Sequence, residues 1–288
     1  MQAAGQLQPS GMRGIDLAEI TTFQPVLSCL RHQRCQIPAM EKYDSYVVCT
    51  SPRSGSTLLC KLLAATGVSG NPASYFFDPS VEDWLADLDI KVDAGKTERE
   101  VLKVVLREVV KKGRSGTGMF GLRQQAHGLA FLSKKLADLY PREATDAVRF
   151  QRAFGTTLYI HLTRDDKIAQ AVSFVKARQT GLWHMAPDGS ELERSAPHRE
   201  LSYDVKALQG CVETMMAYDY SWYEWFLRAG IKPLRIRYDD LANDPVGILR
   251  DVLGRLGLDQ AAAKGSVPGV KKLADTTSVQ WAAQFRAG

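Results

Sequence analysis

The clearest pattern of hydrophobic and polar positions lies in residues 45–67, with the sequence SYVVCTSPRSGSTLLCKLLAATG. It begins with the apolar run Tyr46–Cys49, which is typical of a strand buried on both faces. The polar segment that follows contains Pro52 and Gly55, and these residues favour a tight loop. From Thr57 the apolar residues recur at helical spacing. The stretch therefore predicts a strand, a loop and a helix in direct succession.

The rest of the chain predicts further strands separated by helices. The other predicted strands are 117–123, 156–163 and 233–238. The other predicted helices are 81–88, 98–112, 128–140, 143–154, 165–178, 202–229 and 245–256. The polar, Pro- and Gly-containing residues 179–200 are expected to form a mobile loop. Strands that alternate with helices predict an α/β fold with a parallel sheet and helices on both faces.

The predicted loop after the first strand is suited to an anion. The first N–H groups of a helix have no partner within it, and the helix dipole adds positive charge there. Ser54, Ser56 and Thr57 supply hydroxyl donors, and Arg53 supplies a fixed positive charge. We expect a phosphate or a sulfate here; an ordinary connection between a strand and a helix is the alternative.

This loop lacks the lysine of nucleotide-hydrolysing loops, which read G-x-x-x-x-G-K-[ST]. Ser56 stands directly before Thr57, where that lysine would be. A site without this charge is poorly equipped for a triphosphate with its metal ion, and it suits a 5′ end with only two anionic groups. Arg123 and Arg164 end two later predicted strands. Because right-handed crossovers gather strand ends at one edge of a sheet, we expect both arginines to meet the loop there.

Composition narrows the possible partners and compartment. The net charge of +5 over 288 residues is mild, and no run of Lys or Arg indicates nucleic-acid binding. The five cysteines lack C-x-x-C spacing, which favours unpaired thiols in a reducing cytoplasm. No apolar run reaches transmembrane length, and no basic segment with an apolar core indicates export. Residues 1–42 show little periodicity and are expected to be a disordered extension or a mis-assigned start.

The loop sequence SPRSGSTLL resembles the 5′-phosphosulfate loop of sulfotransferases, which use 3′-phosphoadenylyl sulfate (PAPS). Residues 45–77 resemble, more closely, the N-terminal part of the bacterial trehalose 2-sulfotransferase family. The resemblance resumes, in the same order, at MFGLR, HLTRDDKIAQAVSFVKARQTGLW, WYEWFLRAGIKPLRIRYDDL and LADTTSVQWAAQFRAG. It implies a P-loop NTPase-like, three-layer fold for residues 43–288. It also implies PAPS as co-substrate, 3′,5′-ADP as product, no metal, a carbohydrate or glycolipid acceptor, and a homodimer.

The resemblance also implies roles for individual residues. Those implied to bind the donor are Arg53, Ser54, Gly55, Ser56, Thr57, Arg164 and Ser173. Among them, Arg164 and Ser173 match the arginine and serine that bind the 3′-phosphate in sulfotransferases. Arg53 and Arg123 are expected to stabilise the charge that develops on the leaving phosphate. Arg123 matches a lysine of the family, so the charge is kept and its geometry is changed.

This sequence departs from the family at the general base. The family has a carboxylate before an aromatic pair in the loop after the first helix, and Ser74 stands at that position. A serine hydroxyl does not accept a proton at neutral pH. We therefore expect His127 to be the catalytic base, because it follows the Arg123 strand and an unperturbed imidazole titrates at about 6.5. Asp78 and Glu82 are rivals for this role.

Two other functions stay open. A nucleotide-binding module with impaired catalysis fits the absence of the family carboxylate, whereas the missing loop lysine opposes a P-loop kinase. Asn71, like Ser74, stands where the family has an acidic residue, so the acceptor is expected to differ from trehalose. Lys271 and Lys272 lie in a segment, KKLADTTSVQW, that resembles the family's closure over the nucleotide. They are expected either to contact phosphate or to be solvated.

Overall fold

The computed structural model describes residues 42–93, 95–267, 269–270 and 273–288. The expected extension, residues 1–42, lies outside the described residues except for Lys42, and Lys271 and Lys272 also lie outside them. Residues 42–288 belong to one compact unit.

The described part of this unit contains a sheet of four parallel strands. In spatial order these are β2 (Phe120–Gln125), β1 (Ser45–Thr50), β3 (Thr157–Thr163) and β6 (Leu234–Arg237). β1 lies inside the sheet, and all of its residues are buried. Its uninterrupted apolar character therefore follows from its position, because helices cover both faces of a parallel sheet.

Alternate residues of β1 pack on opposite faces of the sheet. Tyr46 and Val48 belong to one core, with the helices α1 (Ser56–Ala65), α8 (Tyr238–Asn243) and α9 (Pro245–Arg255). A short 3₁₀ helix, Gln260–Ala263, completes this layer. Val47 and Cys49 belong to the opposite core. Its helices are α2 (Val81–Asp87), α3 (Glu98–Arg114), α4 (Ala126–Leu139), α5 (Asp146–Phe154) and α7 (Val205–Ala229).

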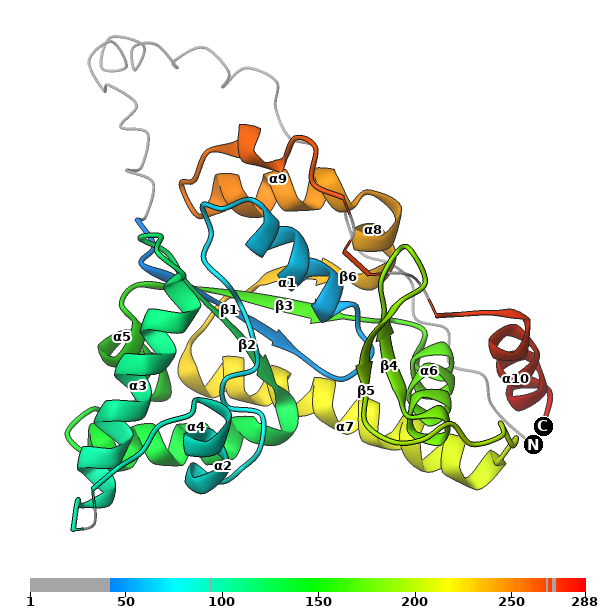
Figure 1. Ribbon diagram of the computed structural model, residues 1–288, viewed down its shortest axis with the longest axis horizontal. Coiled ribbons are helices and arrows are strands. Elements are labelled where there is room, and N and C mark those ends of the chain that lie inside the picture. The colour runs from blue at the N-terminus through cyan, green and yellow to red at the C-terminus, as the bar shows by residue number, and fades with distance from the viewer. Residues whose placement is uncertain (1–41, 94, 268, 271–272) are drawn as a thin grey trace, which may run out of the picture. The chain divides into compact units, whose positions relative to one another are not determined.

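This arrangement confirms the predicted α/β fold, with helices on both faces of a parallel sheet in a P-loop NTPase-like, three-layer order (Figure 1). A third cluster joins α7 to α6 (Lys167–Thr180) and α10 (Thr276–Ala287). Lys176 of α6 lies 2.5 Å from Asp275, which caps α10. The C-terminal helix is therefore fixed to the helix that follows β3.

Residues 179–200 differ from the prediction of a mobile loop. They contain an antiparallel hairpin of β4 (Leu182–Met185) and β5 (Glu191–Arg194). All of β5 is exposed, so no buried face imposes an alternation of polar and apolar residues on its sequence. The hairpin is attached to α6 by hydrogen bonds from Ser195 N to Gly181 O and from Arg194 Nη1 to Thr180 O.

Candidate active site

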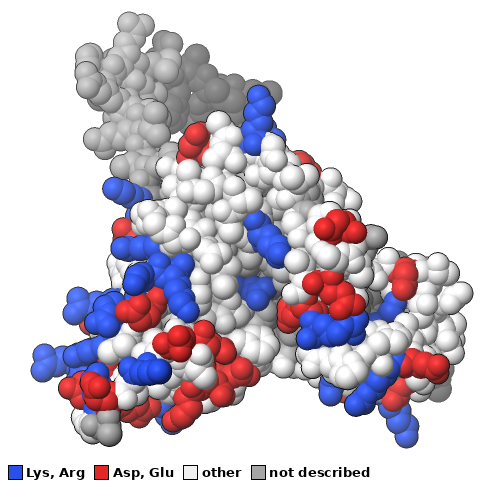
Figure 2. Space-filling view, in the orientation of Figure 1, with Lys and Arg blue, Asp and Glu red and all other residues white. Residues whose placement is uncertain are grey.

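A large cavity, of about 1680 Å³, is lined by residues at the carboxyl ends of β1, β2 and β3, by α6 and α7, and by the hairpin. The lining includes these residues singled out from the sequence: Arg53, Gly55, Ser56, Thr57, Arg123, His127, Arg164 and Ser173. On the face shown in Figure 2, Lys and Arg side chains lie near the centre, in a hollow with uncharged surface around it. The carboxyl edge of the sheet is where ligands bind in open α/β folds.

The loop between β1 and α1 adopts a tight conformation that requires left-handed backbone at two positions. Arg53 has a φ of 63° and Gly55 has a φ of 88°. A Cβ atom on Gly55 would lie 2.6 Å from a ring carbon of Tyr238, so glycine is needed there for space as well as for conformation. Gly55 is also the N-cap of α1 and provides no side-chain cap. The first turn therefore keeps N–H groups available for an anion.

Ser54 does not line the cavity. Its side chain is fully buried, and its hydroxyl donates to Ser51 O at 2.9 Å and contacts the hydroxyl of Thr50. The expected contribution of this hydroxyl to a ligand therefore has no support in the geometry. Ser54 instead stabilises the loop through its hydrogen bonds to Ser51 and Thr50.

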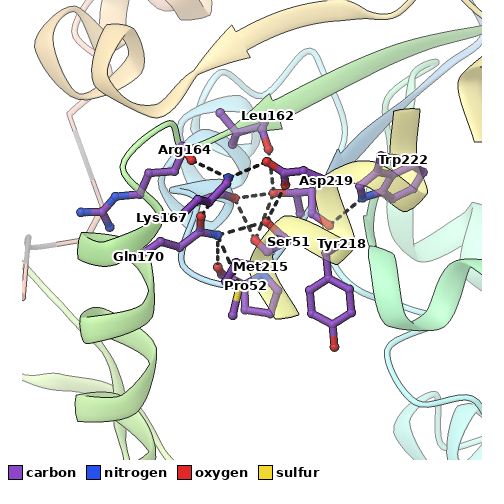
Figure 3. A network of polar contacts seen from close by, with 12 residues as sticks. Ser51, Pro52, Leu162, Arg164, Lys167, Gln170, Met215, Tyr218, Asp219 and Trp222 are labelled. Atoms are coloured by element: carbon purple, nitrogen blue, oxygen red, sulfur yellow. Dashed lines mark hydrogen bonds and ion pairs between the residues drawn. The ribbon is translucent and has the colours of Figure 1, made fainter. Parts of the chain in front are cut away.

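A polar network holds the loop from the side of α6 and α7 (Figure 3). Gln170 Nε2 donates to Pro52 O at 2.7 Å and to Ser51 Oγ at 3.0 Å. Ser51 Oγ donates to Asp219 Oδ1 at 3.3 Å, and the other oxygen of Asp219 lies 2.5 Å from Lys167 Nζ. These residues carry no motif that sequence reasoning would find, because they meet only when the helices pack.

The predicted 3′-phosphate pair meets the loop. Arg53 Nε donates to Ser173 Oγ at 2.9 Å, and its Nη1 donates to Trp183 O at 2.6 Å. Arg164 Nη1 lies 3.4 Å from Arg53 O, and its guanidinium lies 4.5 Å from the ring centroid of Tyr238. α6 therefore brings Ser173 back across the end of β3, and one cavity contains both parts of the expected donor site.

Three arginines of the cavity have no ion-pair partner in the part of the chain that the structure describes. Among the described residues, Arg53, Arg123 and Arg164 form no salt bridge. The carboxylates that follow Arg164 pair with other arginines, Asp165 with Arg237 and Asp166 with Arg286. Burial, and then Arg164, lower the pKa of Arg53 to about 10, and burial lowers the pKa of Arg164. Half-buried arginines without a carboxylate partner favour an anionic ligand.

Arg123 contacts the loop from β2. The sequence predicts Arg123 at the end of this strand. The strand instead continues to Gln125, so Arg123 lies two residues before its end. It pairs in register with Val48, which sets it on the same face of the sheet as α1. Its Nη1 donates to Thr57 Oγ1 at 2.8 Å, and its Nε donates to Ser74 Oγ at 2.8 Å.

His127, the base expected from the sequence, lies against an aromatic wall of the cavity. Because a carbonyl oxygen only accepts, its Nε2 donates to Phe77 O, at 2.9 Å. The two rings meet edge to face at 4.8 Å. Phe77 is 44% exposed, whereas its neighbour Phe76 is buried in the core. The rival carboxylates, Asp78 and Glu82, are not among the residues that line the cavity.

A second histidine, His184 on β4, was not identified from the sequence. Its Nε2 lies 3.0 Å from Thr57 Oγ1, and it lines the same cavity. It lies in the polar segment 179–200, for which the sequence predicts a mobile loop, and its neighbours in space are far away in sequence. No local pattern marks it.

Two features are absent from the described residues. No helix among them is both long and apolar enough to cross a membrane. No group of three or more His, Cys, Asp or Glu side chains in that part of the chain is arranged to hold a metal ion.

Known proteins are similar to this chain over most of its length. A trehalose 2-sulfotransferase of Mycobacterium tuberculosis is 29% identical over 261 residues, which are 84% of this chain and 94% of the relative. One from Mycolicibacterium smegmatis is 27% identical over 259 residues, with the same coverage of both chains. The sulfotransferase domain of the Synechococcus PCC 7002 olefin synthase aligns in structure at 18% identity with a TM-score of 0.41. That alignment covers 88% of this chain and 91% of the domain.

The family model described as Stf0 sulphotransferase matches residues 45–288. The match begins at the first residue of β1 and includes the loop, the three arginines and both histidines of the cavity. The family match covers the whole region that forms the cavity. The arginines without ion-pair partners at the carboxyl edge of the sheet are consistent with this match. The chain belongs to the Stf0 sulphotransferase family.

Proposed function

We propose that the protein transfers a sulfuryl group from PAPS to a hydroxyl of a carbohydrate or glycolipid. The observation that carries the proposal is the pair of anion-binding parts in one cavity. The uncapped first turn of α1, with Arg53 and Thr57, suits the 5′-phosphosulfate. Arg164 and Ser173, beside the same loop, suit the 3′-phosphate that separates PAPS from ordinary adenine nucleotides.

The unpaired arginines account for the chemistry of the leaving group. As the bond from sulfur to the bridging oxygen breaks, negative charge grows on the 5′-phosphate of 3′,5′-ADP. Donors that are already oriented lower the energy of that state, because they need no reorganisation during the reaction. We assign this role to Arg53, Arg123 and the N–H groups at the start of α1. The proposed reaction uses no metal.

The acceptor is proposed to be a carbohydrate on two grounds. The relatives are trehalose 2-sulfotransferases, and the cavity of about 1680 Å³ exceeds the roughly 300–1,000 Å³ of an ordinary ligand pocket. It therefore has room for a sugar beside the nucleotide. Ser74 and Asn71 replace acidic residues of the family, so we expect a sugar other than trehalose to be the better acceptor.

Calorimetry with 3′,5′-ADP and 5′-AMP tests the donor site. We expect 3′,5′-ADP to bind at least about tenfold more tightly, because charge-assisted hydrogen bonds to a phosphate contribute about 1.5–3 kcal/mol. Equal affinities would refute the proposal. Transfer from sulfur-labelled PAPS to trehalose and to cell-derived glycans then tests the reaction.

A nucleotide-binding module without transferase activity is the second candidate, and Ser74 is the observation that favours it. That module would bind 3′,5′-ADP with the same preference but label no glycan. The two functions therefore differ in the transfer assay alone.

We also propose a cytoplasmic homodimer. Met216, Tyr220, Tyr223 and Leu227 of α7 are all more than half exposed and recur at helical spacing on one face. This stripe supports the family's dimeric state, and light scattering of the wild-type protein and of Tyr220→Glu tests it. The described cysteines are all unpaired and buried, which supports a reducing compartment.

A further inference from the structure

The hairpin contributes a histidine and a carboxylate to the cavity. His184 Nε2 on β4 lies 3.0 Å from Thr57 Oγ1 and 3.6 Å from Glu193 Oε2 on β5. Both hairpin residues line the cavity. His184 is thus beside the first turn of α1, where the proposed function has the sulfuryl group.

The hydroxyl of Thr57 lies within hydrogen-bond distance of both Arg123 and His184. Thr57 Oγ1 accepts from Arg123 Nη1 at 2.8 Å, because a guanidinium only donates. The Thr57 hydroxyl keeps its own hydrogen, and the tautomer of a neutral imidazole with its lone pair on Nε2 can accept it at 3.0 Å. In this tautomer the lone pair faces the loop at which the donor is expected to bind.

The surroundings of His184 keep its ring neutral. Burial is the largest cause, and the charges of Arg53, Arg123 and Lys61 add to it, lowering the pKa of His184 to about 4. Glu193 is the carboxylate that faces the ring, and 60% of its side chain is exposed. An anionic donor bound among the arginines offsets their charge and raises the pKa of His184. The ring is therefore unprotonated before the reaction and better able to hold a proton once the donor is bound.

We propose, on the basis of the proposed function, that His184 is the general base for the acceptor hydroxyl and that Glu193 stabilises the imidazolium. When Thr57 donates to an oxygen of the bound donor, Nε2 is free to accept the acceptor's hydroxyl proton. The acceptor oxygen forms the new bond to sulfur, and the bond from sulfur to the 5′-phosphate oxygen breaks. Its electron pair leaves with 3′,5′-ADP. The proton stays on His184 beside Glu193 until solvent removes it.

His184 suits this role better than His127. The hydrogen bond of His127 Nε2 is to Phe77 O, and its ring packs against Phe77. Within the described residues, His127 makes no hydrogen bond or ring contact with the loop or with Arg123. His184 contacts the loop hydroxyl directly, as a base that acts next to the sulfur requires. It also provides the proton acceptor that Ser74 does not.

The test compares His184→Gln with matched histidine variants in the full chain. Sulfuryl transfer from PAPS is measured with a carbohydrate that the wild-type protein labels. We expect His184→Gln to lower kcat by about 10²–10⁴-fold and to remove the fall in kcat at low pH. Glu193→Gln should lower kcat by about two- to fivefold, as the loss of an exposed ion pair implies. His198→Gln, at an exposed histidine that does not line the cavity, should retain the wild-type rate.

Two further measurements separate a base from a structural residue. The Kd of 3′,5′-ADP should change by less than about threefold in His184→Gln, because the variant removes no donor from the phosphate. Added imidazole should restore part of the lost rate to His184→Ala, which leaves room for it, and not to His127→Ala. If His184→Gln does not fold, His184→Ala with and without imidazole gives the same decision.

The outcomes distinguish a failure of the role of His184 from a failure of the proposed function. An active wild-type protein whose His184→Gln variant keeps its rate and pH profile would overturn the role of His184 alone. Loss of activity in His184→Ala that imidazole does not restore would overturn it too. A wild-type protein that shows no preference for 3′,5′-ADP, or that labels no carbohydrate, would overturn the proposed function and this inference with it.

Discussion

Replacing Arg164 with methionine should separate ligand binding from folding. The guanidinium lies 4.5 Å from the ring centroid of Tyr238, and its hydrogen bond to Arg53 O is long, at 3.4 Å. It forms no salt bridge within the described residues. Methionine keeps an apolar stem against Tyr238 and removes the charge. The substitution therefore removes little that stabilises the free protein.

The expected magnitudes follow from these contacts. Loss of the cation–π contact costs about 0.5–1 kcal/mol, and relief of the repulsion between Arg53 and Arg164 acts in the opposite direction. The free energy of unfolding should thus change by at most about 1 kcal/mol. A lost charge-assisted hydrogen bond to the 3′-phosphate costs about 1.5–3 kcal/mol, so 3′,5′-ADP should bind about 10–150-fold more weakly. Binding of 5′-AMP, which lacks that phosphate, should change by less than about threefold.

The assay is calorimetry with both nucleotides, together with urea denaturation. Arg237→Met is the matched control, because Arg237 ends the neighbouring strand β6 but pairs with Asp165 at 3.0 Å and does not line the cavity. It should bind both nucleotides as the wild type does. Equal weakening of both nucleotides in Arg164→Met, or unfolding at a much lower urea concentration, would refute a selective contact between Arg164 and the 3′-phosphate.

Three further predictions concern the stability of the fold. Gly55→Ala should lower the free energy of unfolding by about 2–5 kcal/mol, because left-handed backbone costs about 1–2 kcal/mol and overpacking about 1–3 kcal/mol. The added Cβ would be 2.6 Å from Tyr238, and a loss below about 1 kcal/mol in urea denaturation would contradict this. Asp219→Asn leaves Lys167 without its carboxylate and should cost about 1–3 kcal/mol; an unchanged Tm would count against it. His161 is neutral in the native state because burial lowers its pKa to about 4, whereas the unfolded chain takes up this proton below about 6.5. Stability should therefore fall as the pH falls from about 6.5 to 4, by up to about 1.4 kcal/mol per pH unit, and His161→Phe should reduce that slope. Urea denaturation at several pH values measures it, and equal slopes would be inconsistent with the shift.

The elements that the sequence predicted well are those whose signals are local. The change from an apolar run to helical spacing on either side of Pro52 and Gly55 identifies β1, the loop and α1 without reference to the rest of the chain. The convergence of Arg53 with Arg164 follows from one further rule, the handedness of crossovers. That rule does not predict the contact of Ser173 with Arg53, which depends on how α6 packs across the end of β3. The meeting of the loop and the arginines in one cavity was therefore predictable from the sequence.

The features that the sequence did not reveal depend on contacts between distant segments. His184 meets Thr57 across 127 positions, and Asp219 meets Ser51 across 168. The hairpin that carries His184 has no buried face that would impose a recognisable period on its residues. Ser54 illustrates the converse case, since its residue type suggested a ligand contact and packing turned its hydroxyl inward. Residue type predicts chemistry, but orientation comes from the folded neighbours.

The guanidinium of Arg53 forms hydrogen bonds to two different parts of the cavity lining, which links their free energies. It binds Ser173 on α6 and Trp183 O on the hairpin, so an anion that recruits its N–H groups also changes how firmly the hairpin is held. If the proposed function is right, occupancy of the nucleotide side and occupancy of the hairpin side are energetically coupled. Such coupling is reciprocal: a sugar that orders the hairpin must alter nucleotide affinity by the same factor by which the nucleotide alters sugar affinity.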